Sequence, residues 1–161
     1  MPPPKVAPLG LALTTENSWF ENYAALEGQS NTTPETRHER GLAAQKAIFG
    51  TMIDQLYEQS PKDQLHIQRF LSAHCFGDHY TRKGLDLKLR ELVTLSILIA
   101  LGGVESQIKG HIQGNLNVGN DRSILNDLIT QLLPWVGYPR TLNALKCLNE
   151  VATPPTETKS L

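Results

Sequence analysis

The chain has 161 residues, of which 40% are hydrophobic, and its 15 Lys and Arg residues nearly balance its 16 Asp and Glu residues. A chain of this length is expected to fold as one domain with a buried core. The net charge of -1 lacks the basic excess of a nucleic-acid-binding protein. The longest apolar stretch, residues 92–101, is about half the roughly 20 residues that a membrane span requires. We therefore expect a soluble protein whose partners include neither nucleic acid nor a membrane.

The two cysteines, Cys75 and Cys147, lie far apart in the sequence and form no C-x-x-C motif. They indicate neither a disulfide framework nor a zinc module. The start of the chain has four prolines in its first eight residues, which argues against a cleaved signal peptide. A reducing cytoplasm is therefore the expected compartment.

Apolar residues recur at helical spacing along most of the chain, so the pattern predicts an all-α fold, a single-domain bundle of about six to seven helices. Capping residues, glycines and prolines set the expected boundaries. In chain order, the predicted helices are Glu16–Glu27, 34–59, 61–76, Leu87–Leu101 with Asp86 as N-cap, 105–118 closed by Gly119, 122–133 with Asp121 as N-cap, and a last helix after Gly137-Tyr138-Pro139 that ends near Val151.

Three further expectations concern the chain between and around these helices. Residues 77–84 are polar and flanked by glycine, so a loop is predicted there. The far half of Leu87–Leu101 is apolar on nearly every side, and this helix should be the buried centre. Pro134 should kink or break its helix. The expected organisation is an N-terminal arm with a short helix (1–33), a helical domain (34–151) and a mobile tail (152–161).

His111 is the most informative titratable residue, because it lies mid-helix among apolar residues with Gln107 and Asn115 one turn away on either side. Partial desolvation would poise such an imidazole for proton transfer near neutrality. The alternative is a core histidine bonded to Gln107 or to a backbone carbonyl. Gly110 and Gly114 flank His111 and predict a close approach by another helix or chain.

The segment from Asp78 to Gly84 offers an acid, an imidazole, a phenol and two cations. Arg82 could hold a carboxylate with its guanidinium fork, although a solvated turn is the alternative. Glu91 lies in the first turns of the next helix, where the helix dipole favours an acid as readily as catalysis does. His74 and Asp78 are one helical turn apart, but no third ligand completes a metal site.

Four separated segments together resemble the carboxymuconolactone decarboxylase family, over about residues 40–151. In order, they are FGDHYTRKGL at 76–85, RELVTL at 90–95, HIQGNLNVG at 111–119, and GYP at 137–139 followed by LNAL at 142–145. The resemblance implies the all-α fold of the alkylhydroperoxidase D-like proteins, assembled as homo-oligomers (trimers or hexamers) with the active pocket near subunit contacts.

The resemblance also separates two branches of this fold. In the peroxidase branch a C-x-x-C pair precedes the histidine, and its positions are here Val104 and Gln107. Without that thiolate pair, peroxide reduction has no nucleophile. In the decarboxylase branch, a small dicarboxylated lactone loses carbon dioxide and shifts a double bond without a cofactor.

The resemblance implies a set of site residues, and no metal among them. The catalytic candidates are His111 as proton donor, Asp78, Arg82 and Glu91; the substrate-binding candidates are Tyr80, Arg90, Gln107 and Trp135. Arg82 or Arg90 would grip a carboxylate. The decarboxylases usually have Glu at Asp78, Trp at Tyr80 and Pro at Lys83, and these departures suggest a changed substrate.

The leading hypothesis is a cofactor-independent, 4-carboxymuconolactone decarboxylase-like enzyme that acts on a small carboxylated lactone. One alternative is an alkylhydroperoxidase-like redox enzyme that lacks the C-x-x-C pair. The other is a non-catalytic oligomeric binding module.

Overall fold

The computed structural model describes residues 31–154, and within this range the chain is helical and has no strand. The elements, in chain order, are α2 (Arg37–Phe49), α3 (Met52–Gln59), α4 (Leu65–Phe70), the π-helix η1 (Leu71–Tyr80), α5 (Leu87–Leu101), α6 (Glu105–Asn117) and α7 (Arg122–Val151). The predicted all-α fold is thereby confirmed. The predicted helix Glu16–Glu27 and the end of the chain after residue 154 lie outside the described residues.

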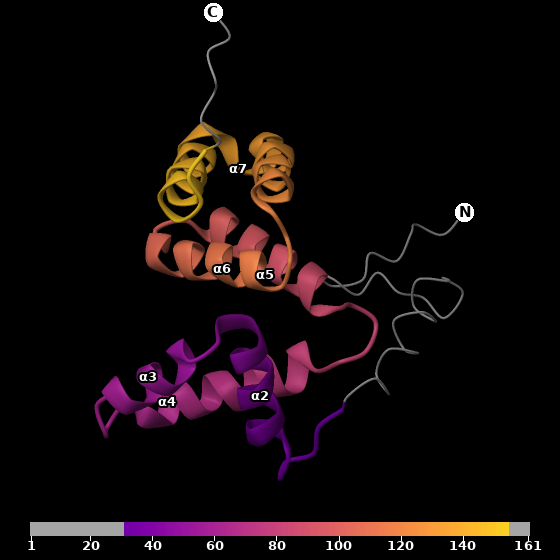
Figure 1. The fold of residues 1–161 in the computed structure, drawn as a ribbon, viewed down its shortest axis with the longest axis vertical. Helices are drawn as coiled ribbons and strands as arrows, with labels where there is room; N and C mark the ends of the chain where they lie inside the picture. Colours follow the sequence, from indigo (N-terminus) through magenta and orange to yellow (C-terminus); the bar gives the residue numbers. More distant parts are fainter. Residues whose placement is uncertain (1–30, 155–161) are drawn as a thin grey trace, which may run out of the picture.

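The helices form two groups that meet at the middle of the molecule, where α5 and α6 lie (Figure 1). In one group, α2 packs along η1, and its core is built on Ile48, Phe76 and Tyr80. In the other, α7 packs on α5 and α6 around a larger core: Leu95, Ile99, Ile108, Ile112, Leu125, Ile129, Ala144, Cys147 and Leu148. The two groups meet mainly where α2 packs on α6.

Two helix starts follow the sequence signals closely. The side chain of Asp86 accepts a hydrogen bond from the backbone N–H of Leu89 at 2.9 Å. Asp121 does the same for Ile124 at 2.9 Å. An aspartate N-cap acts within its own first turn and supplies a partner for an N–H that the helix leaves unpaired. Both predicted N-caps are confirmed.

The single long helix expected over 34–59 is wrong. Gly50 ends α2 with φ at 62°, and α3 begins two residues later at Met52. Only glycine adopts this backbone region at little cost. The apolar spacing continues across the break, which is why the pattern looked like one helix.

The loop expected over 77–84 is also partly wrong, because η1 continues through it to Tyr80, and both Gly77 and Tyr80 are buried. This helix runs very close to α2. A Cβ at Gly41 would lie 1.8 Å from the carbonyl oxygen of Ser72, and one at Gly77 would lie 2.2 Å from that of Arg37. Gly77, which suggested a loop, therefore serves with Gly41 a tight helix crossing.

The break in the C-terminal helix falls at Gly137 (φ 75°, ψ 168°) and not at Pro134, which lies inside α7. Pro139 then stands in the first turn after the break, where a missing N–H costs least. The position of the break predicted from Pro134 is thus wrong, and Gly137, three residues later, sets it.

The expectation that α5 is the buried centre is wrong for the single chain, because only one face of the helix is buried. Its buried side chains are Glu91, Leu95 and Ile99. The opposite face is exposed along its whole length and carries Leu89, Val93, Ile97 and Leu101. None of the helices within 31–154 is long and apolar enough to cross a membrane.

Candidate active site

The carboxylate of Glu91 is the centre of a polar cluster between the two groups of helices. Its side chain is fully buried on α5. Its Oε1 accepts a hydrogen bond from the Tyr80 hydroxyl at 2.9 Å, and its Oε2 lies 2.8 Å from Nδ1 of His111. A buried carboxylate is costly unless hydrogen bonds compensate the loss of water. Here two donors from two other helices supply that compensation.

The contact with Glu91 fixes the orientation of the His111 ring. An ionised carboxylate only accepts, so Nδ1 carries a proton and donates it to Oε2 of Glu91. The other ring nitrogen, Nε2, takes no part in this contact. The ring of Phe49 meets the imidazole edge-on, with centroids 5.3 Å apart. The His111 side chain is 18% exposed, so it is sheltered and still reachable.

Tyr80 donates to the carboxylate oxygen of Glu91 that His111 does not contact. Burial, reinforced by the negative charge of Glu91, raises the pKa of the Tyr80 phenol well above its usual range. The phenol therefore keeps its proton and remains a donor. Because that proton goes to Glu91, the hydroxyl of Thr94 donates to the phenol oxygen in turn. The residue predicted to bind substrate thus orients the carboxylate.

Gly114 provides the space in which this cluster fits. A Cβ at this position would lie 2.8 Å from Oε2 of Glu91 and 2.7 Å from Cε1 of Phe49. The close approach expected at Gly114 is therefore present. At Gly110 a Cβ would meet nothing within 4 Å, so the close approach expected there is absent within the described chain.

Within the described part of the chain, no hydrogen bond joins Asp78 to Tyr80, Glu91 or His111. Asp78 lies on η1 and forms an ion pair with Arg37. Its Oδ2 lies 3.3 Å from Nδ1 of His74, and its Oδ1 accepts a hydrogen bond from the Thr32 hydroxyl at 3.3 Å. Although burial opposes it, hydrogen bonds from His74 and Arg37 lower the pKa of Asp78. These partners tie η1 to the start of α2. Among residues 31–154, no three His, Cys, Asp or Glu side chains gather as a metal site would need.

The two candidate arginines flank the same turn: Arg82 lies on the turn between η1 and α5, and Arg90 lies at the start of α5. Arg90 donates from Nε to the carbonyl of Leu85 at 2.9 Å and from Nη2 to the carbonyl of Arg82 at 2.7 Å. A weaker contact, 3.3 Å long, reaches the carbonyl of Lys83. The guanidinium of Arg90 thus holds the turn in shape, and Arg82 stands on that turn two residues after Tyr80.

The two remaining candidates lie at the surface. Gln107 is exposed one turn before His111 on α6, and its Oε1 accepts from the Ser106 hydroxyl at 2.8 Å. The hydrogen bond between His111 and Gln107, considered as an alternative, is replaced by the one to Glu91. Trp135 is 85% exposed on α7, which lies on the far side of α5 and α6 from α2 (Figure 1).

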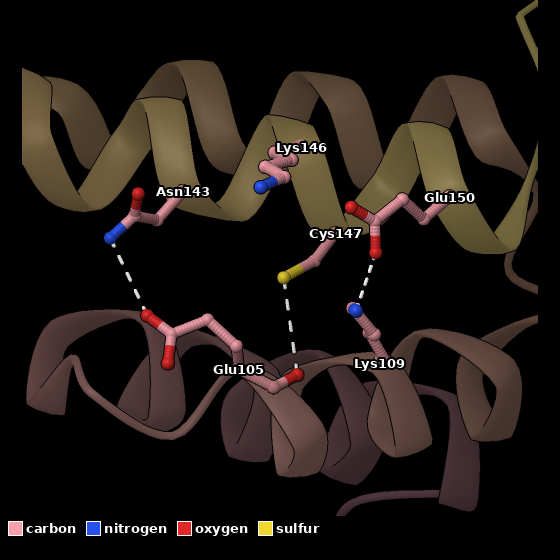
Figure 2. A pocket seen from close by; sticks show the side chains of 6 residues that line it. All are labelled: Glu105, Lys109, Asn143, Lys146, Cys147 and Glu150. Carbon is pink, nitrogen blue, oxygen red and sulfur yellow. Dashed lines mark hydrogen bonds and ion pairs between the residues drawn. The ribbon is translucent and has the colours of Figure 1, made fainter.

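A separate polar hollow of about 280 Å³ lies between α6 and α7. Figure 2 shows its lining: Glu105, Lys109, Asn143, Lys146, Cys147 and Glu150. Its charged groups largely pair with one another, since Lys109 forms an ion pair with Glu150 and Asn143 donates to Glu105 at 3.4 Å. Neither His111 nor Glu91 lines this hollow, so it is separate from the cluster around Glu91.

Both thiols are poor nucleophiles in their surroundings. Burial, with a smaller contribution from the charge of Glu91, raises the pKa of Cys75. Burial also raises the pKa of Cys147, which packs in the core of α5, α6 and α7. The thiolate is the reactive form. Cys75 packs against the core of Ile48, Phe76 and Tyr80.

The sequence gives no sign that Phe49 and Thr94 lie beside the cluster. It shows Asn115 only as a polar neighbour of His111, without the contact of Asn115 to Glu91. The amide of Asn115 is fully buried and donates to the backbone carbonyls of both Glu91 and His111. Its spacing of four residues from His111 was the signal available.

Comparisons with known proteins identify the relatives of this chain. The model of the carboxymuconolactone decarboxylase family matches residues 66–150, which include η1, α5, α6 and most of α7. The chain is also similar to a 4-carboxymuconolactone decarboxylase of Acinetobacter baylyi (strain ATCC 33305 / BD413 / ADP1). The two are 28% identical over 118 residues, which cover 73% of this chain and 87% of that protein. The chain belongs to the carboxymuconolactone decarboxylase family.

Proposed function

We propose that the protein is a cofactor-independent carboxy-lyase that removes carbon dioxide from a small carboxylated lactone. The observation that carries the proposal is the 2.8 Å contact between Nδ1 of His111 and the buried carboxylate of Glu91. A sheltered imidazole oriented by a buried acid is suited to general acid–base chemistry. The similarity to a 4-carboxymuconolactone decarboxylase supports the choice of reaction.

The reaction needs little from the protein beyond charge and one proton. As the bond from the substrate carbon to its carboxylate breaks, carbon dioxide leaves and the electron pair passes into the conjugated lactone. Protonated His111 then gives the proton on Nε2 to the substrate carbon, and the double bond takes its new position. Glu91 stabilises the charged imidazole through Nδ1 before this transfer. Solvent returns the proton to His111 afterwards.

In this proposal Arg82 binds the carboxylate or lactone oxygens of the substrate, because it lies on the turn that follows Tyr80. Arg90 is the other candidate, and its guanidinium donates to three backbone carbonyls of the same turn. In this proposal Arg90 holds the turn on which Arg82 acts. Asp78 serves the same end of the site indirectly, since its ion pair with Arg37 anchors η1.

The redox alternative is less well supported. A thiol peroxidase requires a thiolate, and burial raises the pKa of both Cys75 and Cys147. Val104 and Gln107 occupy the positions of the missing thiol pair. Peroxide consumption that disappears when Cys75 is replaced by serine would favour the redox reading instead.

We also propose that the enzyme is a homo-oligomer, a trimer or hexamer, in which a second copy covers the exposed face of α5. Leu89, Val93, Ile97 and Leu101 lie four residues apart, opposite the buried side chains of that helix, and are 48–62% exposed. Four large apolar side chains in one row are more than a soluble monomer usually leaves to water.

The proposed function is tested by decarboxylation of 4-carboxymuconolactone, followed as release of carbon dioxide. The wild type is expected to be active, and His111→Gln to lose about 100-fold or more in kcat. His66→Gln is the matched control, because His66 is exposed on α4 away from the cluster. A wild-type rate equal to the buffer rate would overturn the substrate, and an active His111→Gln variant would overturn the role of His111.

A further inference from the structure

A pair of buried asparagines joins the backbones of the two residues that form the acid–base pair. Asn115 on α6 is fully buried, and Asn120, just after that helix, is 3% exposed. The side-chain amide of Asn115 donates to the carbonyl of Glu91 at 3.1 Å and to that of His111 at 2.7 Å. One NH₂ group therefore spans α5 and α6 at the turn where the carboxylate meets the imidazole.

Asn120 sets the orientation of this bridge. Its Nδ2 donates to Oδ1 of Asn115 at 2.8 Å and to the carbonyl of Lys88 at 2.9 Å. If the amide of Asn115 turned over, its NH₂ group would face that of Asn120, and its carbonyl would face those of Glu91 and His111. Such a flipped state leaves several buried polar groups unpaired. The bridge therefore has one stable arrangement.

The hydrogen bonds of the helices alone do not explain this network. A carbonyl inside an α-helix already accepts from the N–H four residues later, so the amide of Asn115 adds a second bond at both Glu91 and His111. Asparagine also has low helix propensity in a helix interior. The amide thus adds a constraint between helices at a local cost.

We infer that Asn115 is a positioning residue: its amide, oriented by Asn120, holds Glu91 and His111 at the separation that keeps the hydrogen bond between their side chains intact. This inference rests on the proposed function only for the claim that the hydrogen bond between Glu91 and His111 serves proton transfer. The geometry itself is independent of any substrate.

The test observes the hydrogen bond without a substrate. In the NMR spectrum of the full chain, the ring proton on Nδ1 of His111, assigned by its loss in His111→Gln, should resist exchange with water because it is bonded and sheltered. Asn115→Leu keeps the approximate shape of the side chain and removes the bridge. It is expected to raise the exchange rate of this proton about tenfold, or to broaden its resonance beyond detection.

Gln113→Leu is the matched control, since Gln113 is exposed on the same helix and its amide donates to Asn117 at 2.9 Å, away from Glu91 and the His111 ring. It should leave the ring proton unchanged. Asn120→Ala provides a second variant if Asn115→Leu does not fold, and it is expected to have the same effect to a smaller degree. An unchanged exchange rate in a folded Asn115→Leu or Asn120→Ala protein would overturn the inference.

Activity separates this inference from the proposed function. If the wild type decarboxylates the lactone, Asn115→Leu should lower kcat and leave KM nearly unchanged, because the bridge touches no substrate. If the wild type shows no such activity, the proton-exchange result stands by itself and the proposed reaction is what fails.

Discussion

At the scale of single residues, the chemistry of the site depends on how three side chains share their protons. Tyr80 and His111 both donate to Glu91, one to each carboxylate oxygen. The phenol cannot compete for the role of base, because burial and the charge of Glu91 raise its pKa. The imidazole thus contacts Glu91 through Nδ1, and its second ring nitrogen, Nε2, takes no part in that contact.

The state of Tyr80 gives a pH-dependent prediction for stability. A phenol whose pKa is raised on folding stabilises the protein fully below the unfolded value of about 10, and this contribution is lost as the pH rises above it. Between about pH 10 and 11, the free energy of unfolding of the wild type should therefore fall by up to about 1.4 kcal/mol per pH unit more than that of Tyr80→Phe. Urea unfolding at pH 8, 10 and 11 measures the difference.

Tyr138→Phe controls for the general effect of alkaline pH, because Tyr138 is 69% exposed. This variant should follow the wild type at every pH. Identical slopes for wild type and Tyr80→Phe would show that the phenol is not buried against Glu91.

At the scale of elements, the crossing of α2 and η1 is where the fold tolerates least change. Gly41→Ala would put a methyl group 1.8 Å from a backbone carbonyl that cannot move independently. We expect a loss of more than about 3 kcal/mol in the free energy of unfolding, or no folded protein. Chemical denaturation measures this loss.

Gly110→Ala is the matched comparison in α6, because a Cβ there meets nothing within 4 Å of the described chain. Alanine should stabilise the helix by up to about 1 kcal/mol. Equal losses in the two variants would contradict the close helix crossing at Gly41.

The same elements show which features the sequence could predict. The N-caps Asp86 and Asp121 were predictable because each acts within four residues of its own position. The π-helical course of η1 was not, since it depends on the approach of α2 to Gly77. Glu91 and His111 were each singled out by motif, but their contact spans 20 residues and two helices. Apolar spacing likewise cannot tell a core face from a face that meets another subunit.

At the scale of the whole molecule, the exposed row on α5 predicts assembly. Light scattering coupled to size-exclusion chromatography should find several copies in the wild-type particle. Ile97→Glu places a charge in the middle of the row and should dissociate it, since an unpaired buried charge costs several kcal/mol. Gln131→Glu, exposed on α7, is the control and should remain assembled. A monomeric wild type, or an assembled Ile97→Glu, would contradict the proposed interface.

The cluster lies where the two groups of helices meet, so its geometry reports on how the whole chain is held together. Tyr80 comes from the group that contains α2, while Glu91 and His111 come from α5 and α6. Phe49, at the end of α2, touches the imidazole from the same side as that group. The site is therefore complete only when both groups are folded and in contact.

The most direct test of the central claim is a double-mutant cycle on Glu91 and His111, read as kcat/KM for lactone decarboxylation. If Glu91 acts through His111, Glu91→Gln should lower the rate about tenfold or more in the wild-type background and change it little in the His111→Gln background. The double variant would then be about as slow as His111→Gln alone. Losses that multiply in the double variant would show that the two residues act independently, and would contradict the account.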